Sequence, residues 1–155
     1  MDYEEKLNLT HRSYEAFNRN DREGLLQLYN ADCEWDMSNF AGWPEKQVYR
    51  GREGLADVFE AWLDAWEDFS YEVKQVVNLP GSRVLVVGYG RGHGRHSGAE
   101  VELGPIGQII DFRGGKILRV DNYTDVEEAQ NAAGLSEESL NIFDKHAFGA
   151  HGRSK

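Results

Sequence analysis

Three apolar stretches decide the fold: RVLVVGYGRGHGR at residues 83–95, AEVELGPIGQIIDFR at 99–113 and KILRVDNYT at 116–124. Each is rich in β-branched and aromatic residues, and glycine-containing turns at 97–98 and 114–115 separate them. This pattern predicts strands joined by hairpins. A further strand is predicted over 71–79, before the turn at Pro80-Gly81. Because long strands twist and coil, we expect residues 71–124 to form a curved antiparallel meander.

The residues before this meander are mostly helical in pattern. Apolar side chains recur at helical spacing over 3–19, 22–29 and 52–69. Alternating apolar and acidic residues at 33–37 predict a short strand, and a loop is predicted over 38–51. Helices on one face of a curved sheet would enclose a cone, which is an α+β fold. The third predicted helix carries a broad apolar stripe of Leu55, Val58, Phe59, Trp62, Leu63, Trp66 and Phe69.

Two more helices are predicted after the meander. Asp125, followed three residues later by Glu128, is typical of a helix N-terminus, and Gly134 predicts the end of that helix. A second amphipathic helix is predicted over 136–148, and the residues after it are expected to be mobile. We therefore expect one domain over residues 1–135, and a helical extension with a mobile tail over 136–155.

The charge of the chain narrows the choice of partners. The formal net charge is −10 over 155 residues, and all of the excess negative charge lies in residues 1–72. A nucleic-acid-binding protein needs a basic face, and anionic membranes attract basic segments, so we expect neither partner. The opening MDYEEKLNLTH lacks the regions of a signal peptide, which predicts a cytoplasmic location. Cys33, the single cysteine, is predicted to be a buried thiol.

Three segments carry a resemblance to a known family: AFNRND at 16–21, YRGREGL at 49–55 and GGKILRVDNY at 114–123. In this order and spacing they resemble the SnoaL-like branch of the nuclear transport factor 2-like superfamily, over residues 5–135. The resemblance implies a cystatin-like cone, in which a curved antiparallel sheet wraps around the N-terminal helices. It also implies a homodimer formed through the outer sheet face. The activities that it implies are those of polyketide cyclases, ketosteroid isomerase and limonene epoxide hydrolase.

The same resemblance places amides where related enzymes have acids and bases. Relative to ketosteroid isomerase, Met37 replaces the general-base aspartate, Gln108 replaces the oxyanion carboxylic acid, and the oxyanion tyrosine falls near Ser13, next to Tyr14. Relative to the polyketide cyclases, Asn122 replaces an acid/base aspartate and Gln108 a histidine. Side-chain amides orient a carbonyl or hydroxyl but exchange no proton near neutral pH. Gln108 and Asn122 are thus candidate catalytic residues; alternatively, Gln108 bonds a neighbour within the core.

Two candidate bases remain beside these amides. Alternation along the last strand groups Leu118, Val120 and Asn122 toward the pocket and turns Asp121 to the other face. A slip of one residue would instead direct Asp121 into the pocket and supply a carboxylate. His93, on the strand 83–95, is the other candidate base.

The pocket walls are predicted to be apolar and aromatic. If the interior is hollow, these residues bind a ligand; otherwise they fill the core. In the strand 83–95, four alternating glycines (Gly88, Gly90, Gly92 and Gly94) leave one face without side chains, so that another backbone or a ligand can approach it. The candidate ligand-binding residues are Tyr14, Phe17, Trp35, Met37, Phe59, Trp62, Trp66, Tyr89 and Val120.

No metal or other cofactor is expected. His93 and His96 would face opposite sides of a strand, and no third ligand stands at a spacing suited to zinc.

Two functions remain open. One is a small-molecule pocket protein, acting as a cofactor-independent cyclase, isomerase or hydrolase on a mid-sized apolar or aromatic substrate. The other is a non-catalytic ligand-binding or dimerisation domain. A cavity of roughly 300 Å³ or more beside Gln108 would favour the first, and a core filled by aromatic side chains would favour the second.

Overall fold

A computed structural model describes residues 1–44 and 47–135. The predicted helix at 136–148, the mobile tail and the extension over 136–155 lie outside the described residues. The elements are α1 (Tyr3–Asn18), α2 (Arg22–Gln27), β1 (Tyr29–Asn39), β2 (Val48–Arg50), α3 (Gly51–Asp64), β3 (Trp66–Asn78), β4 (Arg83–Gly94), β5 (Glu100–Arg113), β6 (Lys116–Tyr123) and α4 (Val126–Ala132).

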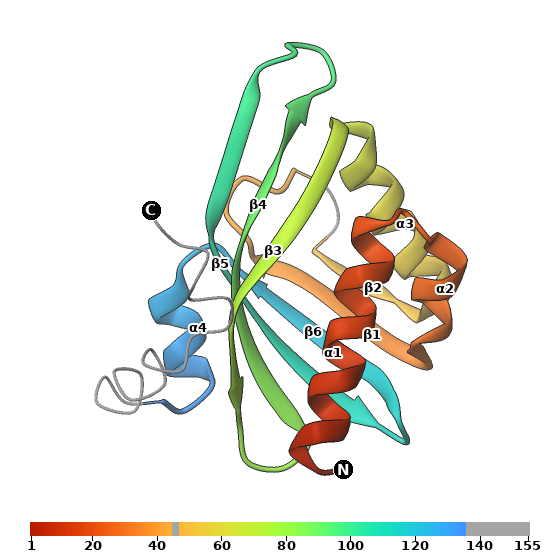
Figure 1. Cartoon of the computed structure of the whole chain (residues 1–155), viewed down its shortest axis with the longest axis vertical. Helices are drawn as coiled ribbons and strands as arrows, with labels where there is room; N and C mark the ends of the chain where they lie inside the picture. The colour runs from red at the N-terminus through yellow and green to blue at the C-terminus, as the bar shows by residue number, and fades with distance from the viewer. Residues whose placement is uncertain (45–46, 136–155) are drawn as a thin grey trace.

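The predicted α+β fold with a curved, mainly antiparallel sheet is confirmed. The six strands are ordered β2-β1-β6-β5-β4-β3, and β3 to β6 form the antiparallel meander. β1 joins this meander by pairing parallel to β6. Figure 1 shows α1, α2 and α3 on one face of the curled sheet and α4 on the opposite face. We call these the inner and outer faces.

Each face has its own apolar core. The inner core joins the helices to inward-facing strand residues such as Val86, Ile110 and Val120. The outer core packs α4 against β4 and β5 through Leu85, Ile109 and Ala129. A Cβ added at Gly107 would lie 2.8 Å from the Cβ of Ala129, so the absence of a side chain on β5 lets α4 pack closely.

The capping signals acted as predicted. The Asp21 carboxylate accepts a hydrogen bond from the backbone N–H of Gly24 and begins α2. Asp125 does the same for α4, accepting from the N–H of Glu127 and Glu128. Gly134 follows the last turn of α4 with a φ of 80°, a conformation that glycine adopts without strain.

The predicted helix over 52–69 is too long. α3 ends at Asp64, and Trp66 and Phe69 belong to β3 instead. Arg95 explains the boundary, because its guanidinium donates to the backbone oxygens of Leu63, Asp64 and Trp66 at the helix end.

β1 and β2 also depart from the prediction. β1 is longer than the predicted strand 33–37, and β2 lies inside the predicted loop 38–51. Neither strand has an apolar run long enough to mark its full length in the sequence.

Candidate functional site

A cavity of about 90 Å³ lies between the inner sheet face and the helices α1 and α3. It falls well short of the roughly 300 Å³ expected for a mid-sized ligand, and it shows that the cone is not completely filled. The cavity is lined by Ser13, Tyr14, Phe17, Leu25, Tyr29, Trp35, Met37, Phe40, Val58, Phe59, Trp62, Phe69, Tyr71, Ile106, Gln108, Ile110, Val120 and Asn122.

A chain of hydrogen bonds crosses one wall of this cavity. The hydroxyl of Tyr14 donates to Oε1 of Gln108, and Nε2 of Gln108 donates to Oδ1 of Asn122 over 2.5 Å. Nδ2 of Asn122 then donates to the backbone oxygen of Asp36 over 3.1 Å. Each amide nitrogen carries a second N–H, so the two amides can still donate to an oxygen in the cavity. We call Tyr14, Gln108 and Asn122 the polar chain.

The titratable groups that line the cavity are phenols. Burial, aided by the nearby Tyr71 and Tyr29, raises the pKa of Tyr14 well above its usual value. Burial also raises the pKa of Tyr71, whose hydroxyl donates to the backbone oxygen of Ile106, and that of Tyr29. Since these phenols stay protonated near neutral pH, the described lining offers orientation and hydrogen bonding without an acid/base pair.

Most of the predicted ligand-binding and amide positions come together in this lining. Four predicted positions lie outside it: Trp66, Tyr89, Asp121 and His93. The predicted residues that line the cavity are Tyr14, Phe17, Trp35, Met37, Phe59, Trp62, Gln108, Val120 and Asn122.

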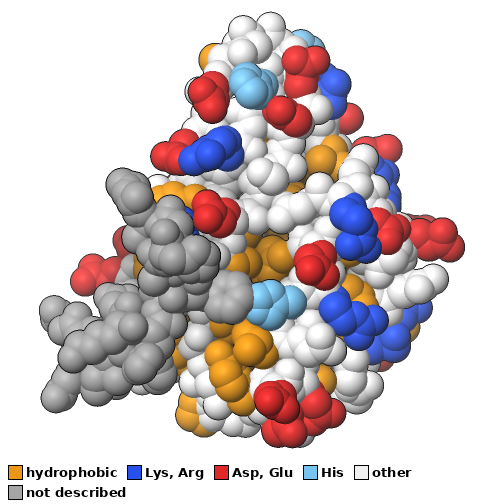
Figure 2. Space-filling model, in the orientation of Figure 1, with side chains coloured by type: hydrophobic (Ala, Val, Ile, Leu, Met, Phe, Trp, Pro, Cys, Tyr) orange, Lys and Arg blue, Asp and Glu red, His pale blue; other side chains and the backbone are white. Residues whose placement is uncertain are grey.

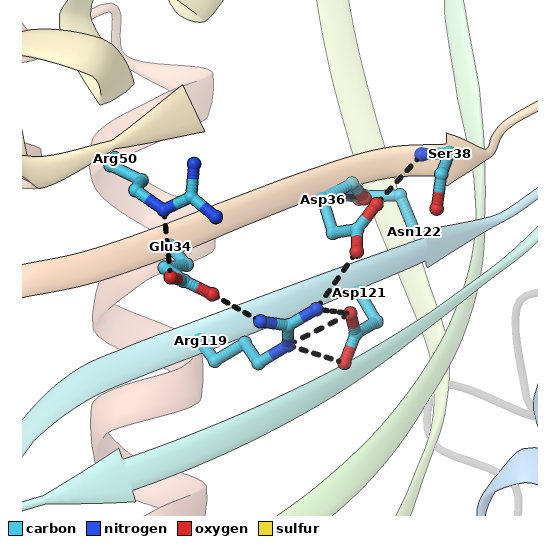
Figure 3. Close-up of polar contacts among 7 residues, drawn as sticks. All are labelled: Glu34, Asp36, Ser38, Arg50, Arg119, Asp121 and Asn122. Carbon is cyan, nitrogen blue, oxygen red and sulfur yellow. Dashed lines mark hydrogen bonds and ion pairs between the residues drawn. The ribbon is translucent and has the colours of Figure 1, made fainter. Parts of the chain in front are cut away.

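Asp121 lies on the outer face, away from the polar chain. Its carboxylate pairs with Arg119 at 2.9 Å, and Figure 3 shows both side chains in an ionic cluster with Asp36 and Glu34. The predicted alternation therefore holds for Asn122, which is 3% exposed and lines the cavity. An inward-facing Asp121 base is excluded by this placement.

The alternation fails at the start of β6. Ile117 joins the inner core, whereas the predicted inward residue Leu118 is half-buried and lies outside it. The cause is a register shift in the β5–β6 pair. Asp111 lies opposite Arg119 and Phe112 lies opposite Ile117, so Leu118 is an extra residue in β6, and such a bulge changes the face on which the residues before it lie.

His93 lies beyond the cavity, toward the end of β4. Its Nδ1 is 3.0 Å from the carboxylate of Asp68, and this contact raises the pKa of His93. The imidazole is thus held by a carboxylate on the neighbouring strand, and it is not part of the cavity lining. Two other side chains of β4 also contact β5: Arg91 pairs with Glu102 at 2.7 Å, and the ring of Tyr89 packs near Gly104.

The alternating glycines of β4 make room for aromatic rings of β3. A Cβ at Gly88 would lie 2.6 Å from Cε1 of Tyr71, and one at Gly90 would lie 2.4 Å from Cζ of Phe69. Both rings line the cavity, and sequence reasoning missed both as lining residues. The glycines were the available signal, because a bare strand face admits a bulky side chain from the adjacent strand.

Trp66 belongs to an aromatic cluster beside the cavity. The centroids of Trp62 and Trp66 are 5.9 Å apart, and those of Trp62 and Phe69 are 5.1 Å apart. Trp43 stacks on Trp62 at 5.8 Å. Trp62 and Phe69 therefore separate the cavity from Trp66, which explains why this indole does not line it.

The surface of the protein carries charges of both signs. Figure 2 shows acidic side chains interspersed with basic ones on one face. Within residues 1–44 and 47–135, no three His, Cys, Asp or Glu side chains come close enough to share a metal ion. No helix in that part of the chain has the length and apolarity needed to cross a membrane.

Solved structures with the same fold are numerous. An NTF2-like protein from Burkholderia xenovorans is 28% identical, with a TM-score of 0.67, over 86% of this chain and 98% of that chain. A protein from Xanthomonas campestris pv. campestris, provisionally named a polyketide cyclase, is 25% identical, with a TM-score of 0.63, over 81% and 94%. A protein with a ketosteroid isomerase-like fold from Catenulispora acidiphila, in complex with trimethylamine, is 15% identical, with a TM-score of 0.65, over 84% and 95%.

No curated protein matches the sequence significantly. The family model described as the SnoaL-like domain matches residues 10–120. This match spans more than half of the sequence and agrees with the fold, so the chain belongs to the SnoaL-like domain family.

Proposed function

We propose that this protein binds a small, uncharged, largely aromatic molecule in the inner cavity, and that the polar chain orients one oxygen atom of that molecule. The observation that carries the proposal is the position of Gln108 and Asn122, two buried amides in a lining that is otherwise mostly apolar and aromatic. Small-molecule pockets typically combine apolar walls with a few convergent polar groups. The absence of charged side chains from the described lining favours an uncharged ligand.

The volume of the cavity favours a ligand with one ring. An apolar cavity of about 150 Å³ accepts benzene, whereas this one measures about 90 Å³, so a one-ring ligand requires only a modest shift of the lining rings. A ligand of two or more rings requires a larger displacement of Trp62 or Phe69. The Catenulispora structure holds trimethylamine, which is also a molecule of few atoms.

Calorimetric titration with 4-methylphenol and 1,4-dimethylbenzene tests the proposal. The two molecules have nearly the same shape, and a hydroxyl group in the first replaces a methyl group in the second. One hydrogen bond contributes about 0.5–1.5 kcal/mol, so the phenol should bind about two- to tenfold more tightly. Gln108→Leu should abolish this preference. Gln75→Leu is the matched control, because Gln75 is a buried amide outside the cavity lining.

Failure of both compounds to bind the folded protein would refute the proposal. The non-catalytic dimerisation domain would then be the better account of the aromatic interior.

A second candidate is a cofactor-independent cyclase, isomerase or hydrolase, favoured by the name of the Xanthomonas structure. The second N–H groups of Gln108 and Asn122 would then stabilise an oxyanion by hydrogen bonding, since the Tyr14 hydroxyl already donates to Gln108. Turnover of a carbonyl substrate by the wild type, and its loss in Asn122→Leu, would support this candidate.

We also propose a homodimer formed through the outer sheet face, where Val87 and Tyr123 are only partly buried against the outer core. Sedimentation velocity should give twice the mass of one chain. A single-chain mass at micromolar concentration would contradict the dimer.

A further inference from the structure

The parallel pair β1–β6 is regular over only a short stretch. Glu34, Trp35 and Asp36 of β1 lie opposite Arg119, Val120 and Asp121 of β6, and the register shifts on both sides of this stretch. Trp35 and Val120 face the cavity, whereas the other four side chains meet on the outer face (Figure 3). The cavity wall and the ionic cluster therefore share the same few residues of backbone.

Arg119 is the centre of the cluster. Its guanidinium pairs with Glu34, with Asp36 at 2.8 Å and with Asp121 at 2.9 Å. The side chain of Asp36 is only 14% exposed, and among the residues that the structure describes Arg50 also reaches the cluster, pairing with Glu34 at 3.1 Å. Three partly buried carboxylates from two strands are thus held together mainly by one cation, and they would repel one another without it.

Asp36 connects this cluster to the cavity. Its carboxylate binds Arg119 and accepts a hydrogen bond from the backbone N–H of Ser38, while its backbone oxygen accepts the Nδ2–H of Asn122. The position of the Asp36 backbone beside β6 therefore fixes the orientation of the Asn122 amide. In this orientation Oδ1 of Asn122 also accepts the hydrogen bond from Nε2 of Gln108.

We propose that Arg119 is a positioning residue: from the outer face it holds β1 against β6 and so fixes the Asn122 amide inside the cavity. Its effect on ligand binding rests on the proposed function, but its effect on the amide does not. A planar guanidinium can bind several carboxylates at once, whereas an ammonium acts as a point charge. Lysine at this position should therefore replace arginine only in part.

Hydrogen exchange of the Asn122 side-chain amide tests the proposal in the ligand-free protein. The signal is assigned in ¹⁵N–¹H spectra by its loss in Asn122→Leu. In Arg119→Met we expect exchange to be about tenfold faster than in the wild type, because local opening becomes easier. In Arg119→Lys the acceleration should be smaller, and this variant serves as the test if Arg119→Met does not fold.

Arg91→Met is the matched control. It also removes an outer-face arginine from an ion pair, that with Glu102, and neither partner lines the cavity. Its Asn122 exchange should equal that of the wild type. In the double variant Arg119→Met/Asp121→Asn, removal of one repelling carboxylate should restore part of the protection, which loss of packing alone would not do.

Unchanged Asn122 exchange in folded Arg119→Met would overturn the proposal, and so would acceleration of equal size in Arg91→Met. Failure of 4-methylphenol to bind the wild type would refute the proposed function and leave this result intact. If the wild type does bind, Arg119→Met should lose the preference for 4-methylphenol over 1,4-dimethylbenzene, whereas Arg91→Met should keep it.

Discussion

Gln108 and Asn122 are direct partners on neighbouring strands, and Nε2 of Gln108 donates to Oδ1 of Asn122 over 2.5 Å. The resemblance predicts that these two amides stand where related enzymes have proton-transferring groups. With Tyr14 at one end and the Asp36 backbone at the other, they form a wall that can direct a ligand oxygen. This wall has no group that titrates near neutral pH.

Ligand binding should therefore be independent of pH between 5 and 9. Burial raises the pKa of Tyr14, Tyr29 and Tyr71 above that of free tyrosine, so their neutral forms prevail throughout this range. 4-Methylphenol itself, like tyrosine, titrates near 10. Calorimetry at several pH values measures the effect. Because Asp68 raises the pKa of His93, a sigmoidal change centred above the ordinary histidine value of about 6.5, and lost in His93→Ala, would show that His93 acts on the cavity.

The glycines of β4 should differ in their tolerance of alanine. At Gly88 the new Cβ would lie 2.3 Å from the backbone oxygen of Glu72, which cannot move aside, whereas at Gly90 it meets the end of the Phe69 ring at 2.4 Å. Urea denaturation should show a loss of about 1–3 kcal/mol for Gly88→Ala and a smaller loss for Gly90→Ala. An equal or reversed order would contradict the packing described above.

Trp62 should limit the size of the ligand. Trp62→Ala removes a lining indole, so 2-naphthol, which the wild type should exclude, should bind this variant. The variant should lose about 2–4 kcal/mol of stability. Trp66→Ala is the control, because Trp66 contacts Trp62 but does not line the cavity. Binding of 2-naphthol to the wild type would show that the rings turn aside readily.

The buried Lys6 should stabilise the β3–β4 hairpin. It is 3% exposed, and its ammonium donates to the backbone oxygens of Leu79, Gly81 and Arg83. Lys6→Met leaves three acceptors without this donor and should lower the free energy of unfolding by about 1–3 kcal/mol. Lys74→Met, which breaks a surface ion pair with Glu72, should change it by less than about 1 kcal/mol.

Local signals predicted much of this molecule. The Gly114-Gly115 turn located a hairpin, Asp21 and Asp125 located helix starts, and strand alternation placed Asn122 inward. Each of these features depends on backbone geometry within a few residues, and a single sequence contains the information that determines it.

Features that depend on tertiary contacts could not be predicted in this way. Trp66 fits a helical stripe as well as a strand, and its strand placement depends on tertiary contacts with Gly94 and Arg95 of β4 and the turn after it. The face of Ile117 depends on the unpaired Leu118 of its own strand, which only the pairing with β5 reveals. Lys6 is buried by a hairpin far along the chain.

The central claim is that the polar chain orients an oxygen atom in an otherwise mostly apolar cavity. A crystal structure of the protein with 4-methylphenol tests it most directly. We expect the ring in the cavity against Trp35 and Phe59, with its oxygen within about 3.2 Å of Tyr14, Gln108 or Asn122. A ring bound elsewhere, or one whose oxygen points away from these three side chains, would contradict the account.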